Sequence, residues 1–185
     1  LYFGLVVFLG GVLLPVAWLF KVPVGRFISY VKEPWLIAFS TSTSEAALPR
    51  AMENMEAMGC PRRIVSFVLP LGYTFNLDGT TLYLSMASIF VAQAAGVNLT
   101  IGQQFTMMLT LMLTSKGVAG VPRASLVILA GTLASYNLPL EGVTLILGVD
   151  AVMDMARTSV NVVGNCLATV VITKWEGEYD EDRVA

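Results

Sequence analysis

Polar side chains recur on one face of a long apolar segment near the end of the sequence. Residues 140–174 are long and apolar enough to cross a bilayer, and we predict them to form the last transmembrane helix. At about 100° per residue, one stripe of this helix carries Asp150, Asp154, Arg157, Asn161 and Asn165. Charged groups within a membrane helix face a protein interior or a watery cavity, so the stripe predicts a site. The alternative is a soluble amphipathic helix with a solvated polar face.

Earlier blocks of the chain predict one full span and one pair of short helices. Residues 1–20 are apolar and predict a transmembrane helix, and residues 21–34 carry basic side chains that indicate a cytoplasmic linker. Residues 35–60 contain two halves that are each too short or too polar to cross about 30 Å of hydrocarbon. We therefore predict a re-entrant hairpin whose Ser- and Thr-rich tip, residues 40–44, lies at membrane depth. A Ser/Thr-rich surface linker is the alternative.

The next apolar block, residues 61–96, is interrupted in its middle. Gly72 and Gly79 bracket Asn76 and Asp78, and such a sequence breaks a helix and frees backbone carbonyl groups. These carbonyl oxygens and the Asp78 carboxylate together predict a cation site made of oxygen ligands. The alternative, an uninterrupted helix, would bury Asp78 without a partner for its charge.

A second interrupted block, residues 103–138, repeats the pattern of the first hairpin from the outer side of the membrane. Its apolar halves are again too short to span, and a tip at residues 114–122 lies between them. A hairpin followed by a long helix thus occurs twice, once from each side, which is the inverted repeat typical of secondary transporters. Residues 175–185 form an acidic tail that we predict to be disordered.

Composition narrows the class of protein. The 185 residues are 56% hydrophobic and only 13% charged, so we predict an all-α integral membrane protein. The net charge of −2 does not indicate any particular partner, and we expect no nucleic acid partner. Histidine, the commonest general base and zinc ligand, is absent, and the two cysteines lack the spacing of a metal site. Because the sequence begins inside an apolar block, we expect it to be the C-terminal part of a longer protein.

Four motifs occur in order along the chain: a serine-rich tip ending in Ala47-Leu48-Pro49, then Asn76-Leu77-Asp78-Gly79-Thr80, Gly117-Val118-Ala119-Gly120-Val121-Pro122, and Asp154-x-x-Arg157-Thr158-x-x-Asn161. Together they resemble the C-terminal half of the dicarboxylate/amino acid:cation symporters, the glutamate transporter family, in its bacterial branch. The resemblance covers essentially the whole chain. It implies a multi-pass homotrimer within the lipid of the inner (cytoplasmic) membrane, in which a transport domain moves like an elevator past a scaffold. Residues 1–20 would be the end of that scaffold, most of which would precede this chain.

The resemblance also implies a substrate site. Arg157 matches the residue that clamps the substrate's side-chain carboxylate, a role that suits the planar guanidinium fork, and Asp154 matches the acceptor of its amino group. Relatives that carry C4-dicarboxylates do not keep an acid there, so Asp154 favours aspartate or glutamate over succinate, fumarate or malate. The implied substrate-binding residues are Thr43, Ser44, Thr80, Val121, Ser125, Asp154, Arg157, Thr158 and Asn161.

The resemblance implies a coupling-cation site at the interrupted block, where Asn76 and Asp78 could hold a sodium ion. Two departures from sodium-driven members matter: Asn165 replaces an aspartate, and the Lys116 ammonium stands where a further sodium would bind. Both changes recur in the bacterial proton-coupled branch, so we expect coupling to protons and/or sodium. The candidate proton carriers are Asp78, Asp154 and Glu45. The full set of implied cation-site residues is Gly72, Thr74, Asn76, Asp78, Ser115, Lys116, Asn161 and Asn165.

The expected function is secondary active symport of an acidic amino acid, with no cofactor and no enzymatic reaction. A C4-dicarboxylate symporter is the alternative. An intramembrane aspartyl protease would need two facing carboxylates, such as Asp78 and Asp150, but only Gly148-Val149-Asp150 remains of its Gly-x-Gly-Asp signature. An arginine on the same face would also keep a carboxylate ionised. A channel or a substrate-binding receptor would conduct or bind without coupled transport.

Overall fold

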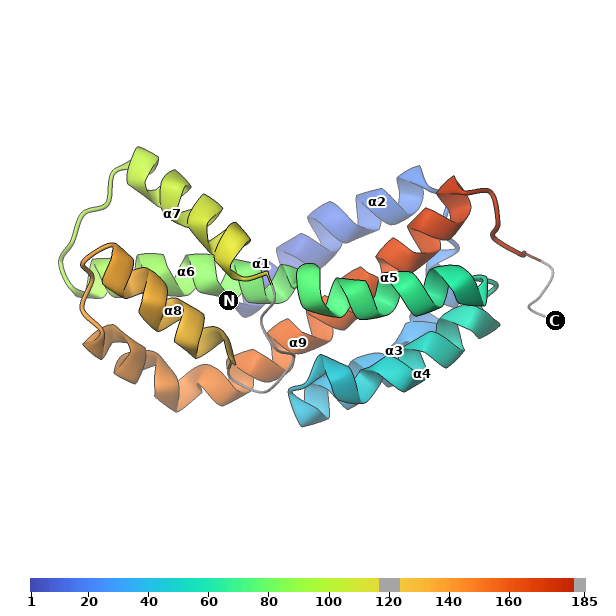
Figure 1. Cartoon of the computed structure of the whole chain (residues 1–185), viewed down its shortest axis with the longest axis horizontal. Coiled ribbons are helices and arrows are strands. Elements are labelled where there is room, and N and C mark those ends of the chain that lie inside the picture. The colour runs from blue at the N-terminus through green and yellow to red at the C-terminus, as the bar shows by residue number, and fades with distance from the viewer. Residues whose placement is uncertain (117–123, 182–185) are drawn as a thin grey trace.

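One helix, α9 (Glu141–Trp175), runs through the whole molecule and contacts most of the other helices (Figure 1). The computed structural model describes residues 1–116 and 124–181, and this part of the chain is helical and contains no strand. A helix of 35 residues is about 52 Å long, which exceeds the thickness of a hydrocarbon core. Its most apolar window is 78% buried. α9 is therefore the central helix of the fold, and it contains all residues of the polar stripe.

The apolar N-terminal block is helical in three successive pieces, α1 (Tyr2–Phe8), the π-helical η1 (Leu9–Leu13) and α2 (Leu14–Leu19). Pro15 lies in the first turn of α2, directly after the wider π-helical turns, because its ring cannot join the regular hydrogen-bond ladder. Among the described residues, this span and α9 are long and apolar enough to cross a membrane. Only 11% of the N-terminal span is buried, so most of its apolar side chains face outward.

The first helix pair is α3 (Val24–Thr41) and α4 (Ser44–Ala57), which pack against each other. α3 begins at Val24, so most of residues 21–34, which we predicted to be a linker, is helical instead. Pro34 lies inside α3 and cannot donate a hydrogen bond to the Tyr30 carbonyl. The side-chain amide of Asn54 donates to that oxygen at 2.7 Å. The helix continues because α4 satisfies the carbonyl group that the proline frees.

The interrupted block forms two helices, α5 (Arg62–Phe75) and α6 (Asp78–Ala94), which follow one another in line (Figure 1). Asn76 and Leu77 join them with non-helical backbone angles, φ −120° and −105°. The break leaves the last carbonyl groups of α5 and the first N–H groups of α6 available to other partners. The break therefore places backbone polar groups that lack helical hydrogen-bond partners in the middle of an apolar helix pair.

The second helix pair, α7 (Ile101–Thr114) and α8 (Ala124–Ser135), packs against α6. Thr100 and Gln103 form a capping box at the start of α7, in which each side chain accepts from the other residue's backbone N–H. These helices contain 14 and 12 residues, or about 21 and 18 Å, which is less than a hydrocarbon core. The end of α7 and the α3–α4 turn both lie near the middle of the molecule (Figure 1).

Two apolar cores occupy opposite ends of α9. One core packs the C-terminal part of α9, including Val162 and Val170, against α3, α4 and α5. The other core packs α6, α7 and α8 around Leu111, Leu129 and, on α9, Ile146. The polar stripe of α9 and the α5–α6 break lie between them. The fold therefore encloses its polar groups at mid-height.

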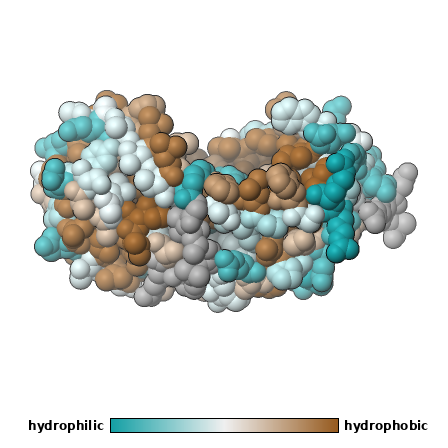
Figure 2. Space-filling view, viewed as in Figure 1, coloured by the Kyte–Doolittle hydropathy of each residue, from teal (hydrophilic) through white to brown (hydrophobic). Residues whose placement is uncertain are grey.

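Large apolar side chains also cover much of the outer surface, shown in brown in Figure 2. Exposed examples come from the N-terminal span and from α7 and α8, and include Phe3, Trp18, Ile101 and Val127. A soluble monomer rarely exposes so many large apolar side chains. This surface suits contact with lipid or with further protein.

The acidic tail packs onto the molecule as far as it is described. The Asp180 N–H donates to the Gly59 carbonyl at 3.1 Å, and Arg63 forms an ion pair with Glu178. The half-buried Tyr179 packs against the core formed by α3, α4 and α5. The prediction of disorder is therefore wrong for residues 176–181. It was based on the acidic composition, which does not show that Tyr179 anchors the tail.

Candidate functional site

All members of the predicted polar stripe are buried. Asp150 is 0% exposed, Asp154 5% and Arg157 1%, and Asn161 and Asn165 are similarly enclosed. A buried charge is costly unless it is paired and hydrogen-bonded. The partners of each side chain therefore decide what the stripe can do.

Arg157 is held between two carboxylates and an aromatic ring. Its Nη1 donates to Asp150 Oδ1 at 2.9 Å, and its Nε lies 3.0 Å from Asp154 Oδ1, which also accepts from Thr158 Oγ1 at 3.2 Å. The guanidinium carbon lies 3.9 Å from the centre of the Tyr83 ring, in cation–π contact. Arg157 Nη2 is buried without a hydrogen-bond partner among the described residues. The guanidinium thus retains a donor that a ligand carboxylate can use.

Asn161 ties α9 to the start of α6. Its Oδ1 accepts from the N–H groups of Gly79 and Thr80 at 2.7 and 3.3 Å, and its Nδ2 donates to Thr80 Oγ1 at 2.9 Å. These N–H groups are orphan donors of a helix N-terminus, so Asn161 caps α6 from another helix. Thr80 and Asn161, both predicted as substrate contacts, therefore meet in the structure and are bonded to each other.

Asn76 and Asn165 exchange two hydrogen bonds beside Asp78. Asn76 Nδ2 donates to Asn165 Oδ1 at 3.1 Å, and Asn165 Nδ2 donates to the Asn76 carbonyl at 3.2 Å. Asn76 Nδ2 also donates to Asp78 Oδ2 at 3.4 Å. A Cβ atom at Gly72 would overlap Asn165 Oδ1, and one at Gly164 would overlap Asp78 Oδ2. Most of the predicted cation-site residues are thus packed tightly where the break meets α9.

Lys116 reaches the same break from the end of α7. Its Nζ donates to the carbonyl of Phe75, the last residue of α5. The carbonyl groups of Phe75 and Asn76 therefore accept from the Lys116 ammonium and the Asn165 amide. Carbonyl oxygens of this kind are hard-cation ligands. Lys116 and Asn165, the two departures from the sodium-driven members, thus donate to carbonyl oxygens that could otherwise bind a cation.

The other predicted substrate-site residues lie at the ends of the hairpin helices. Thr43 is the N-cap residue of α4, and the buried Ser44 is the first residue of that helix. Ser125 is buried in the first turn of α8, and its Oγ has no hydrogen-bond partner within the described ranges. Val121 falls outside the described residues. Unsatisfied donors therefore exist on α8 as well as on α9.

Three further residues predicted for the cation site or as proton carriers make no hydrogen bond to the buried cluster among the described residues. Thr74 is exposed and donates to the Pro70 carbonyl within its own helix. Ser115 is buried but bonds locally to the Met112 carbonyl at 3.3 Å. Glu45 is exposed on the first turn of α4.

Sequence reasoning missed Tyr83 and the specific role of Asp150. Tyr83 Oη donates to Asp150 Oδ1 at 2.8 Å while its ring faces Arg157. A signal was available, because Tyr83 follows Thr80 by three residues and so shares its face of α6. The arrangement as a whole offers a carboxylate clamp, an anionic acceptor and oxygen ligands in one buried region.

Comparisons with known proteins agree with this chemistry. The sodium:dicarboxylate symporter family matches residues 1–175. The proton/glutamate-aspartate symporter of Escherichia coli (strain K12) is 52% identical over 99% of this chain and 41% of its own length. The proton/sodium-glutamate symport protein of Bacillus caldotenax is 48% identical, over 98% of this chain and 43% of its length. The C4-dicarboxylate transport protein of Cupriavidus necator is also 48% identical, over 100% of this chain and 43% of its own length.

The chain spans less than half the length of these relatives. Within that part, the family match covers every helix of the structure, from α1 to α9. The buried arginine, its acidic neighbours and the interrupted α5–α6 pair all lie inside the matched residues. The chain therefore belongs to the sodium:dicarboxylate symporter family, a family of membrane transporters.

Proposed function

We propose that the full-length protein is a secondary active symporter of an acidic amino acid, aspartate or glutamate, in the cytoplasmic membrane. The observation that carries this proposal is the buried Arg157, whose Nη2 lacks a hydrogen-bond partner among the described residues while Asp154 lies beside it. A substrate carboxylate on Arg157 and a substrate amino group on Asp154 would form two charge-assisted contacts in one enclosed site. The names of the Escherichia coli and Bacillus caldotenax relatives support the same substrate class.

A C4-dicarboxylate symporter is the second candidate, because the Cupriavidus necator relative is as similar to this chain as the Bacillus caldotenax one. Overall identity therefore does not decide the substrate. Asp154 favours an amino acid substrate, because its carboxylate would attract a substrate amino group. A dicarboxylate without an amino group would bring only negative charge close to it. The two candidates predict opposite preferences between aspartate and succinate.

The coupling ion is proposed to be the proton, sodium or both. Asn165 Nδ2 and Lys116 Nζ bind carbonyl oxygens at the α5–α6 break, and a tethered ammonium supplies charge that a bound sodium would otherwise bring. Asp78 remains as an anionic group beside Asn76, and it can take up either a proton or a sodium ion. The driving cation would therefore bind at Asp78, and the Lys116 ammonium would take the place of a further sodium ion.

We also propose that both helix pairs are re-entrant hairpins related by an inverted repeat. α4, α7 and α8 are each too short to span, and the ends of both pairs approach the polar middle of α9 (Figure 1). A substrate held between two such tips would be released to either side as the unit moves, as in an elevator mechanism. The outward-facing apolar span Tyr2–Leu19 is available for contact with lipid or a scaffold, and a homotrimer would provide that scaffold.

Competition for uptake tests the proposed substrate class. We expect unlabelled aspartate and glutamate to abolish uptake of labelled aspartate by the full-length protein, because both present a second carboxylate and an amino group. Succinate should compete weakly and leucine not at all. Stronger competition by succinate than by glutamate would favour the C4-dicarboxylate candidate, and uptake of neither substrate would contradict the proposal.

The cation site has its own prediction, made with Gly164→Ala. The added methyl group would displace the Asp78 carboxylate, which is the end of a flexible side chain, so the fold should survive. We expect the apparent affinity for the driving cation to fall by roughly 10-fold or more, since a contact with a charged group contributes about 1.5–3 kcal/mol. The measurement is uptake as a function of sodium concentration and of external pH.

Gly148→Ala is the matched control for this variant. Gly148 lies on the same helix, and a Cβ atom there meets nothing within 4 Å. We expect wild-type cation dependence and an unchanged or slightly raised thermal stability. Equal behaviour of the two variants would show that Asp78 does not hold the driving cation.

A further inference from the structure

The guanidinium of Arg157 has two edges, each with a pair of donors, and both are half occupied. Nη1 and Nη2 form the end-on pair, in which Nη1 donates to Asp150 at 2.9 Å. Nε and Nη2 form the side-on pair, in which Nε lies 3.0 Å from Asp154. Nη2 belongs to both pairs and is without a hydrogen-bond partner among the described residues. An incoming carboxylate can therefore bind two donors only if one aspartate leaves.

Asp150 is the aspartate that a second helix holds in place. Its Oδ1 accepts from Arg157 Nη1 and also, at 2.8 Å, from the hydroxyl of Tyr83 on α6. Tyr83 therefore contacts the pair twice, through its hydroxyl on Asp150 and through its ring face on the guanidinium. A tyrosine that touches both partners fixes their relative orientation.

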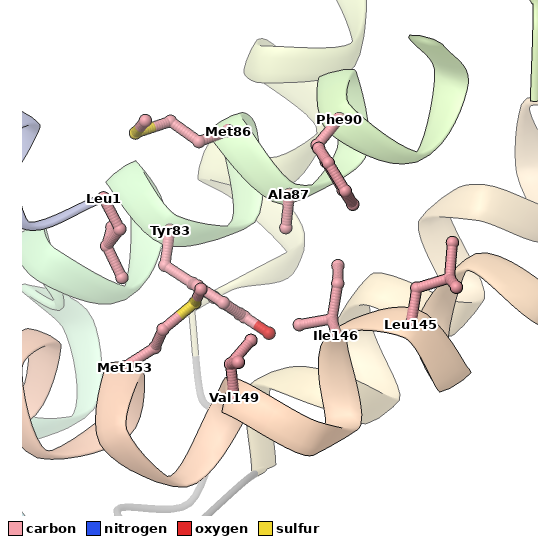
Figure 3. A pocket seen from close by; sticks show the side chains of 9 residues that line it. All are labelled: Leu1, Tyr83, Met86, Ala87, Phe90, Leu145, Ile146, Val149 and Met153. Carbon is pink, nitrogen blue, oxygen red and sulfur yellow. The ribbon is translucent and has the colours of Figure 1, made fainter. Parts of the chain in front are cut away.

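The surroundings of Tyr83 strengthen this attachment. Its side chain reaches from α6 toward α9 at the edge of an apolar cavity of about 230 Å³ (Figure 3). Val149, Ile146 and Met153 line the cavity on the α9 side and offer no side-chain hydrogen-bond donor or acceptor better than a thioether. Asp150 and Tyr83 are 0% and 1% exposed, and a hydrogen bond to a charged group is stronger where water is excluded, so their contact is protected from competition.

Asp154 contacts the other edge of the guanidinium. Its release from Nε would open the complete side-on pair, Nε and Nη2, to a carboxylate, while Nη1 stayed on Asp150. The released Asp154 carboxylate would then be the acceptor that a substrate amino group needs. One rearrangement thus prepares both halves of the site.

We infer that Asp150, aligned by the Tyr83 hydroxyl, is a positioning residue that fixes Arg157, and that Asp154 is the partner Arg157 exchanges for the substrate carboxylate. This inference rests on the proposed function and adds a division of labour between two aspartates. It makes Tyr83 and Asp150 determinants of selectivity for acidic over neutral side chains, although neither touches the substrate.

Tyr83→Phe tests the inference with little risk to the fold, because it keeps the ring over Arg157 and removes only the hydroxyl. In the full-length protein we expect KM for aspartate to rise roughly 3- to 10-fold, as for loss of one ordinary hydrogen bond, with Vmax nearly unchanged. Asp150→Asn should raise KM further. Inhibition by asparagine, which lacks the second carboxylate, should change much less, so selectivity for aspartate over asparagine should fall.

Ser88→Ala is the matched control, since Ser88 is buried on α6 and its Oγ has no hydrogen-bond partner among the described residues. It should behave as wild type. An unchanged KM and selectivity in Tyr83→Phe, or a loss of Vmax alone, would overturn the positioning role. Failure of the wild type to transport any acidic substrate would instead overturn the proposed function, so the two failures are distinguishable.

Discussion

Arg157→Lys is expected to lower kcat/KM for aspartate uptake by roughly 10- to 100-fold, because the loss of one hydrogen bond to a charged group costs about 1.5–3 kcal/mol. Lysine keeps the positive charge between Asp150 and Asp154, so the buried site stays compensated. It cannot keep the fork, since an ammonium is a point charge that does not bind two oxygens in parallel. Uptake kinetics of the purified, reconstituted protein measure the loss.

Arg50→Lys is the control for the general effect of exchanging these side chains. Arg50 pairs with Glu33 and Glu53 at the surface, where solvent screens the interaction. We expect wild-type uptake from it. Retention of wild-type KM by Arg157→Lys would show that this arginine does not bind the substrate carboxylate.

Asp154→Ser is expected to reduce aspartate affinity by about 100-fold, again through loss of one partner of a buried charged contact. The substrate amino group would lose its anionic acceptor, while Arg157 would remain available through Nη2 and the vacated Nε. Because the site also loses one negative charge, binding of succinate should improve. Binding of both ligands to the purified protein, measured by calorimetry, reports the change in preference.

Ser159→Ala accompanies this test as a buried control on the same helix. Its hydroxyl bonds to the Ala156 carbonyl at 2.8 Å within α9 and takes no part in the cluster. It should leave both affinities unchanged. Unaltered aspartate affinity in Asp154→Ser would refute the amino-group assignment.

Helical periodicity was sufficient to identify the polar stripe. A spacing of three and four residues placed Asp150 to Asn165 on one face, and a membrane-length apolar helix had to bury that face. The structure agrees, since all of these side chains are buried. The break at Asn76 and Leu77 was also predicted, from glycines and polar residues that weaken a helix, although Gly72 and Gly79 are themselves helical, in α5 and α6.

Partners across the fold could not be obtained in the same way. The Tyr83–Asp150 bond joins residues 67 apart, and the bonds from Asn161 to the start of α6 join residues 81 and 82 apart. Such contacts depend on how helices dock, which periodicity does not specify. Two wrong predictions, the linker at residues 21–34 and the disordered tail, have the same origin. The Asn54 bond keeps α3 helical through Pro34, and Tyr179 anchors the tail to the core.

Ion-driven uptake by the reconstituted full-length protein tests the central claim most directly. Proteoliposomes are given an inward proton gradient with sodium rigorously excluded, and labelled aspartate is followed inside. We predict uptake that stops when the gradient is dissipated. Asn165 and Lys116 donate hydrogen bonds to the carbonyl oxygens at the α5–α6 break, and Asp78 can still bind a proton. Aspartate uptake that requires sodium and ignores pH, or accumulation of succinate in place of aspartate, would contradict the account.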